Sequence, residues 1–157
     1  MTALAGPYGH PLHPVLVPVP IGAWVASFIF DLASRLSGQP TVFATGAFWL
    51  LGLGLLGAAA AALLGFLDLF AIPTGTKAFR TGLAHMTLNL AVVAAFGGSL
   101  LLRRGHLDRP GGTPWGLLVL SAAALVALAV SGWLGGRLAY RYGVRVAAET
   151  TQADAYR

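Results

Sequence analysis

Two histidines near the start of the chain, His10 and His13, stand three residues apart, and each is followed by a proline. Imidazoles at this spacing can share a metal ion if the chain is helical or turned. A third histidine, His85, is the only one well inside an apolar run. A ring in such a place can hydrogen-bond a carboxylate, or bind a metal or a haem iron. These residue types therefore suit ligation of a metal or a haem.

His85 belongs to a polar stripe within its apolar run. Thr81, His85 and Asn89 recur every four residues, with apolar residues elsewhere. Such a stripe is expected to turn inward in a helical bundle. Asp68 and Arg137 should lie at a similar depth, because each is near the end of its own apolar run. We expect Asp68 to accept a hydrogen bond from His85 or to pair with Arg137.

Four long apolar runs must position these side chains. Hydrophobic residues make up 57% of the 157 residues and charged residues only 10%, whereas a soluble domain carries about 25% charged residues. Each run is long enough for the roughly 20 residues that a membrane span needs. The predicted spans are 14–36, 42–72, 80–102 and 115–140. We therefore predict an all-α integral membrane protein with an N-terminal segment, 1–13, a four-helix up-and-down bundle, 14–140, and a polar tail, 141–157.

The start of the first span is rich in proline, at Pro14, Pro18 and Pro20. Proline is tolerated in the first helical turn and is costly deeper in a helix. Either the helix begins near Pro14 with a kink, or it begins near Pro20 and follows an extended strap. We favour the kinked helix.

Alternating spans bring most of the polar residues to one end of the bundle. Both termini lie at this end, which we call the terminal end, and the opposite end is the far end. The terminal end collects His10, His13, Asp68, His85, Asn89, Arg137 and Tyr140. It also carries six basic residues against four at the far end, which predicts a cytoplasmic location for both termini.

Two further patterns have structural interpretations. Asp31 and Arg35 are four residues apart, which predicts a local ion pair on one helix face. Small residues at spacings of four let helices approach closely in lipid, or clear space for a flat cofactor. They occur in the second and fourth runs, as Gly57, Ala61 and Gly65 and as Gly132 and Gly136.

Several classes of function are disfavoured by what the chain lacks. It has no cysteine, so it has no disulfide or thiolate metal site. Its net charge of +5 is not accompanied by the soluble basic face that nucleic-acid binding needs. We find no nucleophile with a recognisable base and no phosphate loop, so an enzyme is the least favoured class. His106 and Asp108 are expected at a solvated surface.

Several segments resemble one membrane-protein family. They are GHPLHPVLVPVPIG near the start, Asp31, GFLDL, His85 with Asn89, and SGWLGGRLAYRYGVRV. Together they resemble the family called domain of unknown function 2231 (DUF2231) over nearly the whole chain. The resemblance implies a multi-pass protein of the bacterial inner membrane. Some relatives are joined to iron–sulfur or cytochrome modules, which implies a redox partner.

Three functions remain open from the sequence. The leading hypothesis is a membrane redox subunit with one b-type haem near the terminal end, with His13 and His85 as axial ligands and with Asn89 and Arg137 also in the site. The second is a zinc or copper site formed by His10, His13, His85 and Asp68. The third is a scaffold or assembly subunit in the lipid bilayer, in which the polar cluster only holds the helices together.

Overall fold

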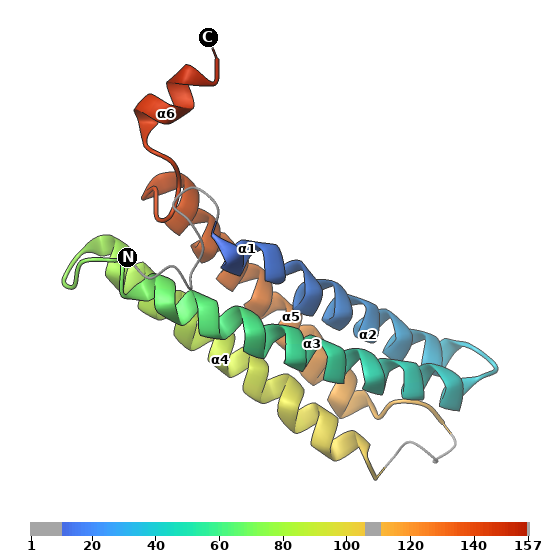
Figure 1. The fold of residues 1–157 in the computed structure, drawn as a ribbon. Coiled ribbons are helices and arrows are strands. Elements are labelled where there is room, and N and C mark those ends of the chain that lie inside the picture. Colours follow the sequence, from blue (N-terminus) through green and yellow to red (C-terminus); the bar gives the residue numbers. More distant parts are fainter. Residues whose placement is uncertain (1–10, 106–110, 157) are drawn as a thin grey trace.

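The computed structural model describes residues 11–105 and 111–156, and it is helical throughout most of them. Figure 1 shows the arrangement of these elements. They are α1 (Leu12–Leu16), α2 (Pro18–Leu36), α3 (Pro40–Leu69), α4 (Lys77–Arg103), α5 (Trp115–Gly136), the π-helical turn η2 (Arg137–Arg141) and α6 (Glu149–Asp154). No strand occurs in the part of the chain that the structure describes.

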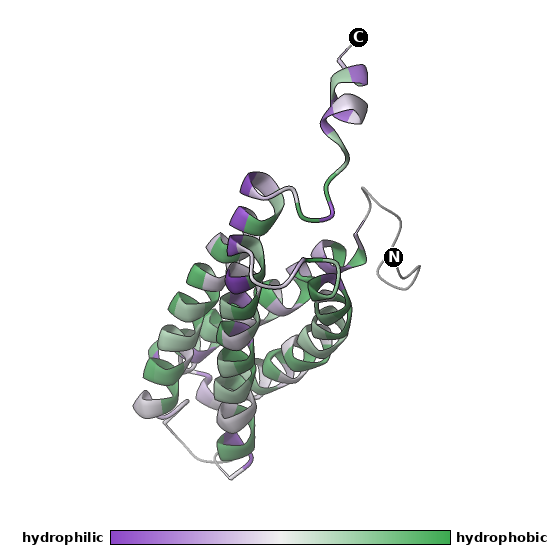
Figure 2. Cartoon of the chain, turned by 90° about the vertical axis from the view of Figure 1, so that its left-hand side faces the viewer, coloured by the Kyte–Doolittle hydropathy of each residue, from purple (hydrophilic) through white to green (hydrophobic). Residues whose placement is uncertain are grey.

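Four helical segments are long and apolar enough to cross a membrane. They are Leu12–Leu36, Pro40–Leu69, Lys77–Arg103 and Trp115–Arg141. Apolar residues cover them along their length, whereas the segments that join or follow them are more polar (Figure 2). The predicted four-helix membrane architecture is therefore confirmed, and every predicted boundary lies within three residues of the observed one.

The first span is a kinked helix rather than a helix with an extended strap. α1 ends at Leu16 and α2 begins at Pro18, while Val17 between them keeps helical angles, φ −56° and ψ −33°. The Val17 N–H donates to the carbonyl of His13 at 3.2 Å. Pro18 has no N–H to donate, so the helical ladder is interrupted there. The kink fixes where the first turn, with His13, lies relative to α2.

The four spans form two helical hairpins. The first hairpin comprises α1, α2 and α3, and the second comprises α4, α5 and η2. Consecutive spans run in opposite directions, so α1 and η2 both lie at the terminal end (Figure 1). α2 packs mainly on α3, and α4 packs mainly on α5. The interface between the two hairpins is therefore the seam where side chains from distant parts of the sequence meet.

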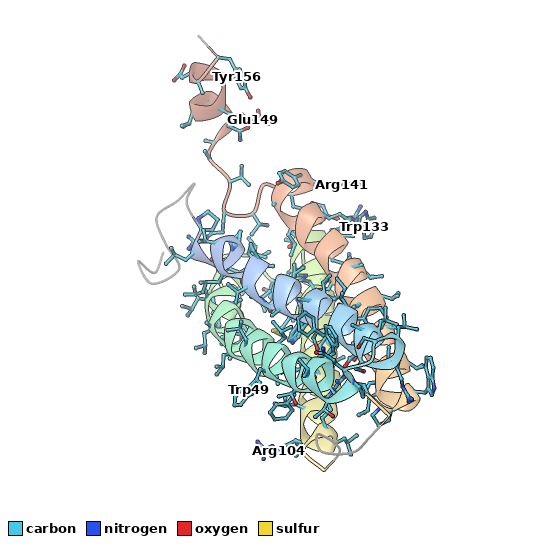
Figure 3. The ribbon with its side chains drawn as sticks, turned by 90° about the vertical axis from the view of Figure 1, so that its right-hand side faces the viewer. Trp49, Arg104, Trp133, Arg141, Glu149 and Tyr156 are labelled. Atoms are coloured by element: carbon cyan, nitrogen blue, oxygen red, sulfur yellow. The ribbon has the colours of Figure 1, made fainter. Side chains whose placement is uncertain are left out.

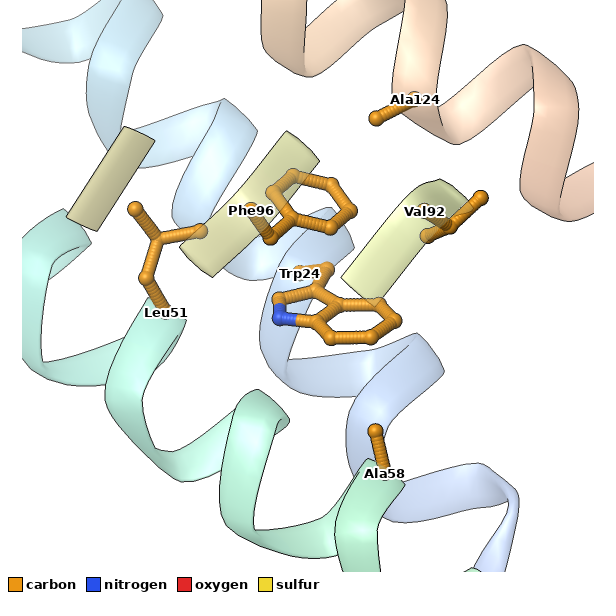
Figure 4. Close-up of a cluster of buried hydrophobic side chains, with 6 residues drawn as sticks. All are labelled: Trp24, Leu51, Ala58, Val92, Phe96 and Ala124. Atoms are coloured by element: carbon orange, nitrogen blue, oxygen red, sulfur yellow. The ribbon is translucent and has the colours of Figure 1, made fainter. Parts of the chain in front are cut away.

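An aromatic stack fills the middle of this seam. The rings of Trp24 and Phe96 lie 4.5 Å apart at an interplanar angle of 23°, among Leu51, Val92 and other buried side chains (Figure 4). Gly54 leaves the space that the indole occupies, because a Cβ atom there would lie 2.2 Å from Nε1 of Trp24. The small residues of α3 thus let α2 and its large side chain approach closely.

The outer surface of the bundle is apolar, as a lipid-facing surface must be. Trp49, Trp115 and Trp133 are 70%, 64% and 61% exposed. Figure 3 shows Trp133 and Arg141 towards the terminal end and Arg104 at the far end. Trp115 and Trp133 lie near span ends, where aromatic residues favour the headgroup region. α6 follows the last span and extends away from the bundle (Figure 1).

Candidate functional site

Two imidazoles face each other across the seam at the terminal end. The ring centroids of His13 and His85 lie 6.4 Å apart, and the ring planes are nearly perpendicular, at 85°. His13 comes from α1 in the first hairpin, and His85 comes from α4 in the second. The expected convergence of these two histidines is therefore observed.

The first hairpin orients His13 through α3. Nδ1 of His13 lies 2.7 Å from the carbonyl oxygen of Ala61. A carbonyl oxygen only accepts hydrogen bonds, so Nδ1 carries the proton and Nε2 keeps its lone pair. One turn further along α3, a Cβ atom on Gly65 would lie 3.0 Å from the imidazole. The repeat of small residues in α3 therefore provides both the acceptor and the space for this ring.

The second hairpin orients His85 in the same way. Nδ1 of His85 lies 2.8 Å from the carbonyl oxygen of Ser131 and 3.0 Å from its hydroxyl. Four residues later, a Cβ atom on Gly135 would lie 3.2 Å from Cε1 of His85. Each imidazole thus packs against one turn of a neighbouring helix. In that turn, one residue accepts a hydrogen bond through its carbonyl, and the residue four positions later is a glycine. The roles of Ser131 and Gly135 were not predicted from the sequence, although Ser131 is a polar residue one turn before a glycine in an apolar span.

Asn89 completes the surroundings of His85. Its side-chain amide nitrogen lies 3.1 Å from Nε2 of His85, where it donates to the lone pair that the Nδ1–H tautomer leaves. Both residues are half-buried, as expected of an inward polar stripe. The hydroxyl of Thr81, the third residue of the stripe, donates to the carbonyl of Lys77 at 2.9 Å.

Asp68 contacts neither His85 nor Arg137 in the way that we expected. Its carboxylate accepts a hydrogen bond of 2.7 Å from Nε of Arg145, and the two side chains are only 13% and 7% exposed. Arg145 has φ +61°, a left-handed conformation that is uncommon for any residue except glycine. The prediction failed because Arg145 follows the last span in the sequence, and a left-handed residue turns the chain back to the end of α3.

Arg137 is held by two aromatic rings instead of by Asp68. Its guanidinium carbon lies 4.9 Å from the ring centre of Trp133 and 5.9 Å from that of Tyr142. Its Nη2 donates to the hydroxyl of Tyr142 at 3.2 Å. The single polar network that we expected is therefore three separate groups: the imidazoles with Asn89, the Asp68–Arg145 pair, and Arg137 with its rings.

The expected metal site has two of its four ligands side by side. Within residues 11–105 and 111–156, no three metal-ligating side chains form a group that could hold an ion. His13 and His85 are close together, while Asp68 is engaged with Arg145. His10 lies outside the described residues, as do His106 and Asp108.

A second polar cluster lies at the far end, and the pairing predicted for it is wrong. Asp31 pairs with Arg103 of α4 and not with Arg35. Both guanidinium Nη atoms donate to the carboxylate, with 2.7 Å between Nη2 and Oδ2. Asp31 is 0% exposed and Arg103 is 3% exposed. Arg35 instead donates to the carbonyl of Thr113 at 2.7 Å and lies over the ring of Trp115.

Neighbouring hydroxyl groups complete the hydrogen bonding of this ion pair. Thr113 donates to Asp31 at 2.8 Å. Arg103 donates to Ser99 at 3.1 Å and to Ser121 at 3.3 Å. A buried ion pair that is fully hydrogen-bonded has no free group with which to hold a ligand. The far-end cluster is therefore a structural clamp between the hairpins.

Comparison with known proteins agrees with the fold. A family model described as "Predicted membrane protein (DUF2231)" matches residues 9–148, which include both polar clusters. No curated protein and no solved structure matches the chain.

Proposed function

The chain belongs to the DUF2231 family of predicted membrane proteins, and on that premise we propose that it is a membrane redox subunit that holds one b-type haem between His13 and His85. The observation that carries the proposal is the facing pair of imidazoles, each bonded through Nδ1 to a carbonyl of its own hairpin. Histidines that bind metals usually donate their other ring N–H in this way, because the bond fixes the tautomer and the ring orientation.

The separation of the two rings supports ligation of one iron by both. With metal–nitrogen distances of about 2 Å, two imidazoles on opposite sides of an ion have centroids roughly 6 Å apart. The observed separation is 6.4 Å. Two ligands suffice for a haem iron, whereas a zinc site needs about four. Asp68 is occupied by Arg145, and this favours haem over the alternative of zinc or copper bound by His10, His13, His85 and Asp68.

Each residue of the site would have a distinct role. A bound b-type haem supplies one-electron chemistry, at a potential that its axial ligands and their hydrogen bonds set. The carbonyls of Ala61 and Ser131 orient the imidazoles and increase their basicity. Asn89 donates to the lone pair of His85 that a metal would take, so this hydrogen bond competes with ligation. An iron–sulfur or cytochrome protein is the class of partner that exchanges single electrons with such a site.

Visible spectroscopy and metal analysis of the detergent-purified protein test the proposal. We expect a Soret band that shifts on reduction, and its loss in both His13→Ala and His85→Ala. His106→Ala is the matched control, because it removes a histidine from the segment between α4 and α5. Asn89→Leu should retain the band, since it removes a competitor and not a ligand.

The possible results separate the three functions. Loss of the band in both variants supports the haem site. Bound zinc or copper in place of haem supports the alternative metal site. Wild-type protein with neither haem nor metal, even after it is supplied with both, contradicts the proposal and favours a scaffold.

We also propose that the terminal end faces the cytoplasm of a bacterial cell. The exposed cations Lys77, Arg80 and Arg141 lie at this end. At the far end, Arg103 is buried against Asp31, so fewer free cations are left there to set the orientation. Reporter fusions after Arg157 test this: activity of a periplasm-dependent reporter at that position would contradict the proposal.

A further inference from the structure

Arg137 lies on the lipid-facing side of the last span, away from the imidazoles. Gly135 contacts His85, and two further residues turn a helix by about 200°. The guanidinium of Arg137 lies 4.9 Å from the ring centre of Trp133, which is 61% exposed on the outer surface. Arg137 is also one turn before Arg141, where the span ends. The cation is therefore at the level of the membrane surface, beside lipid.

The guanidinium of Arg137 is held in place but is incompletely bonded. Its Nη2 donates to Tyr142, and the guanidinium carbon lies 4.9 Å and 5.9 Å from the ring centres of Trp133 and Tyr142. Its Nε is buried and has no hydrogen-bond partner in the described part of the chain. A guanidinium has five N–H donors, so both donors on Nη1 and the second donor on Nη2 remain for a ligand. No described carboxylate bonds to this cation.

The neighbouring groups also favour an anion. The side chain of Thr81 and the nearby Arg137 cation both lower the pKa of the Tyr142 phenol. Lys77 lies one turn before Thr81 on the same face of α4 and is exposed. The first turn of α4 adds the positive end of a 27-residue helix. The cations of Arg137 and Arg141 thus lie near Tyr142, at the end of the bundle where α4 begins.

We infer that Arg137 forms a binding site for the phosphate group of an anionic membrane lipid. The planar guanidinium suits bidentate bonds to phosphate oxygens, and the aromatic rings hold it in one orientation. The exposed Trp133 and Tyr140 would contact the upper acyl chains of the same lipid, as interfacial aromatic residues do. The site does not depend on the haem, because it lies on the other face of α5.

Quenching of Trp133 by brominated lipids tests this inference. For this experiment, Trp49→Phe and Trp115→Phe are introduced into the full chain, which leaves Trp133 as the lipid-exposed indole. Trp24 is only 2% exposed and contributes a constant background fluorescence. Nanodiscs of phosphatidylcholine receive brominated phosphatidylglycerol or brominated phosphatidylcholine in equal amounts. We expect the anionic lipid to be preferred at Trp133 by about fivefold. For each variant we take the ratio of the quenching by the two brominated lipids. Quenching by a bound cofactor is the same in both measurements, so it cancels in this ratio.

Variants of Arg137 decide the result. Arg137→Gln should abolish the preference, and Arg137→Lys should retain part of it, because the charge remains but the paired N–H donors of the guanidinium are lost. Arg104→Gln, an exposed cation at the far end, is the matched control and should change nothing. A full preference in Arg137→Gln overturns the site. Equal loss in the Gln and Lys variants also overturns it, since the packing of Trp133 would then be the cause.

A separate arm distinguishes a lipid from a free anion. Inorganic phosphate in excess, at constant ionic strength, should leave the lipid preference unchanged. If inorganic phosphate removes the preference, the phosphate site stands but its lipid source is overturned.

Discussion

The two ends of the bundle use similar polar side chains in opposite ways. At the far end, Asp31 of the first hairpin bonds directly to Arg103 of the second, and hydroxyl groups complete the network. At the terminal end, each imidazole bonds to a carbonyl of its own hairpin, and the two rings only face each other. A closed network joins the two hairpins at the far end, whereas at the terminal end each ring bonds only within its own hairpin, and this is where we propose the ligand site. The difference shows that burial of polar groups alone does not identify a site.

The largest expected effect concerns the far-end clamp. Asp31→Ala leaves the cation of Arg103 buried without its partner. Breaking a buried pair in this way costs about 3–5 kcal/mol of unfolding free energy. Titration with sodium dodecyl sulfate in detergent–lipid micelles measures the loss, and Arg104→Ala is the control at the exposed neighbour. A loss below about 1 kcal/mol, typical of an exposed pair, would remove the distinction between the two ends.

A pair of glycines compares the backbone at the two ends. Gly112 (φ +70°, far end) and Gly143 (φ +65°, terminal end) both have left-handed conformations. A Cβ atom on Gly112 would lie 2.4 Å from the carbonyl oxygen of Ser34, whereas one on Gly143 would contact nothing within 4 Å. Gly143→Ala should therefore cost only the backbone strain, about 1 kcal/mol.

Gly112→Ala should cost about 2–3 kcal/mol, because the bond of 3.0 Å from Thr113 N–H to the Ser34 hydroxyl would also break. The same denaturation assay measures both variants. Equal losses for the two glycines would show that the far end is no more tightly packed than the terminal end.

A smaller effect is expected for the ion pair at the terminal end. Asp68→Asn keeps the shape of the side chain but removes its charge opposite Arg145, a pair that is less deeply buried than Asp31 and Arg103. We expect a loss of about 1–2 kcal/mol in unfolding free energy, because the amide oxygen of Asn can still accept the hydrogen bond from Arg145. Glu149→Gln, an exposed acid in α6, is the control. A loss as large as that of Asp31→Ala would show that this pair is also a clamp between the hairpins.

The smallest effect on stability is expected at the imidazole pair itself. His85→Ala removes a hydrogen bond to Ser131 within one hairpin, and such bonds in membrane bundles average about 0.6 kcal/mol. The measurement uses protein prepared without haem, with Thr87→Ala as the exposed control on α4. A loss of several kcal/mol would make His85 a structural residue and weaken its assignment as a ligand.

The fold could be predicted from the sequence because the membrane imposes a simple demand. Each span must be a run of apolar residues of sufficient length, and every observed span has one. The alternation of the spans was enough to bring His13 and His85 together. Their acceptors could not be predicted, because the carbonyls of Ala61 and Ser131 belong to the backbone that every residue shares.

The partner of Asp31 shows where local rules fail. A spacing of four residues points to Arg35, but the pairing partner is Arg103, 72 residues away. The choice depends on how α2 packs against α4, which no local pattern contains. A signal was present nevertheless: Ser99 and Arg103 are four residues apart, and Asp31 is at the same end of the bundle. At the terminal end, the histidines were predicted to meet because they lie at similar depths in neighbouring spans. The same reasoning at the far end predicts that Asp31 and Arg103 meet.

The 72-residue separation of Asp31 and Arg103 also matters during synthesis of the chain. The ribosome completes the first hairpin before Arg103 exists, so α2 enters the bilayer with a lone carboxylate that costs up to about 3 kcal/mol. The apolar residues of Leu12–Leu36 outweigh this cost, and insertion proceeds. The half-made protein then carries an unsatisfied charge that only the end of α4 neutralises. A chain that stops after α3 would keep this carboxylate without its Arg103 partner.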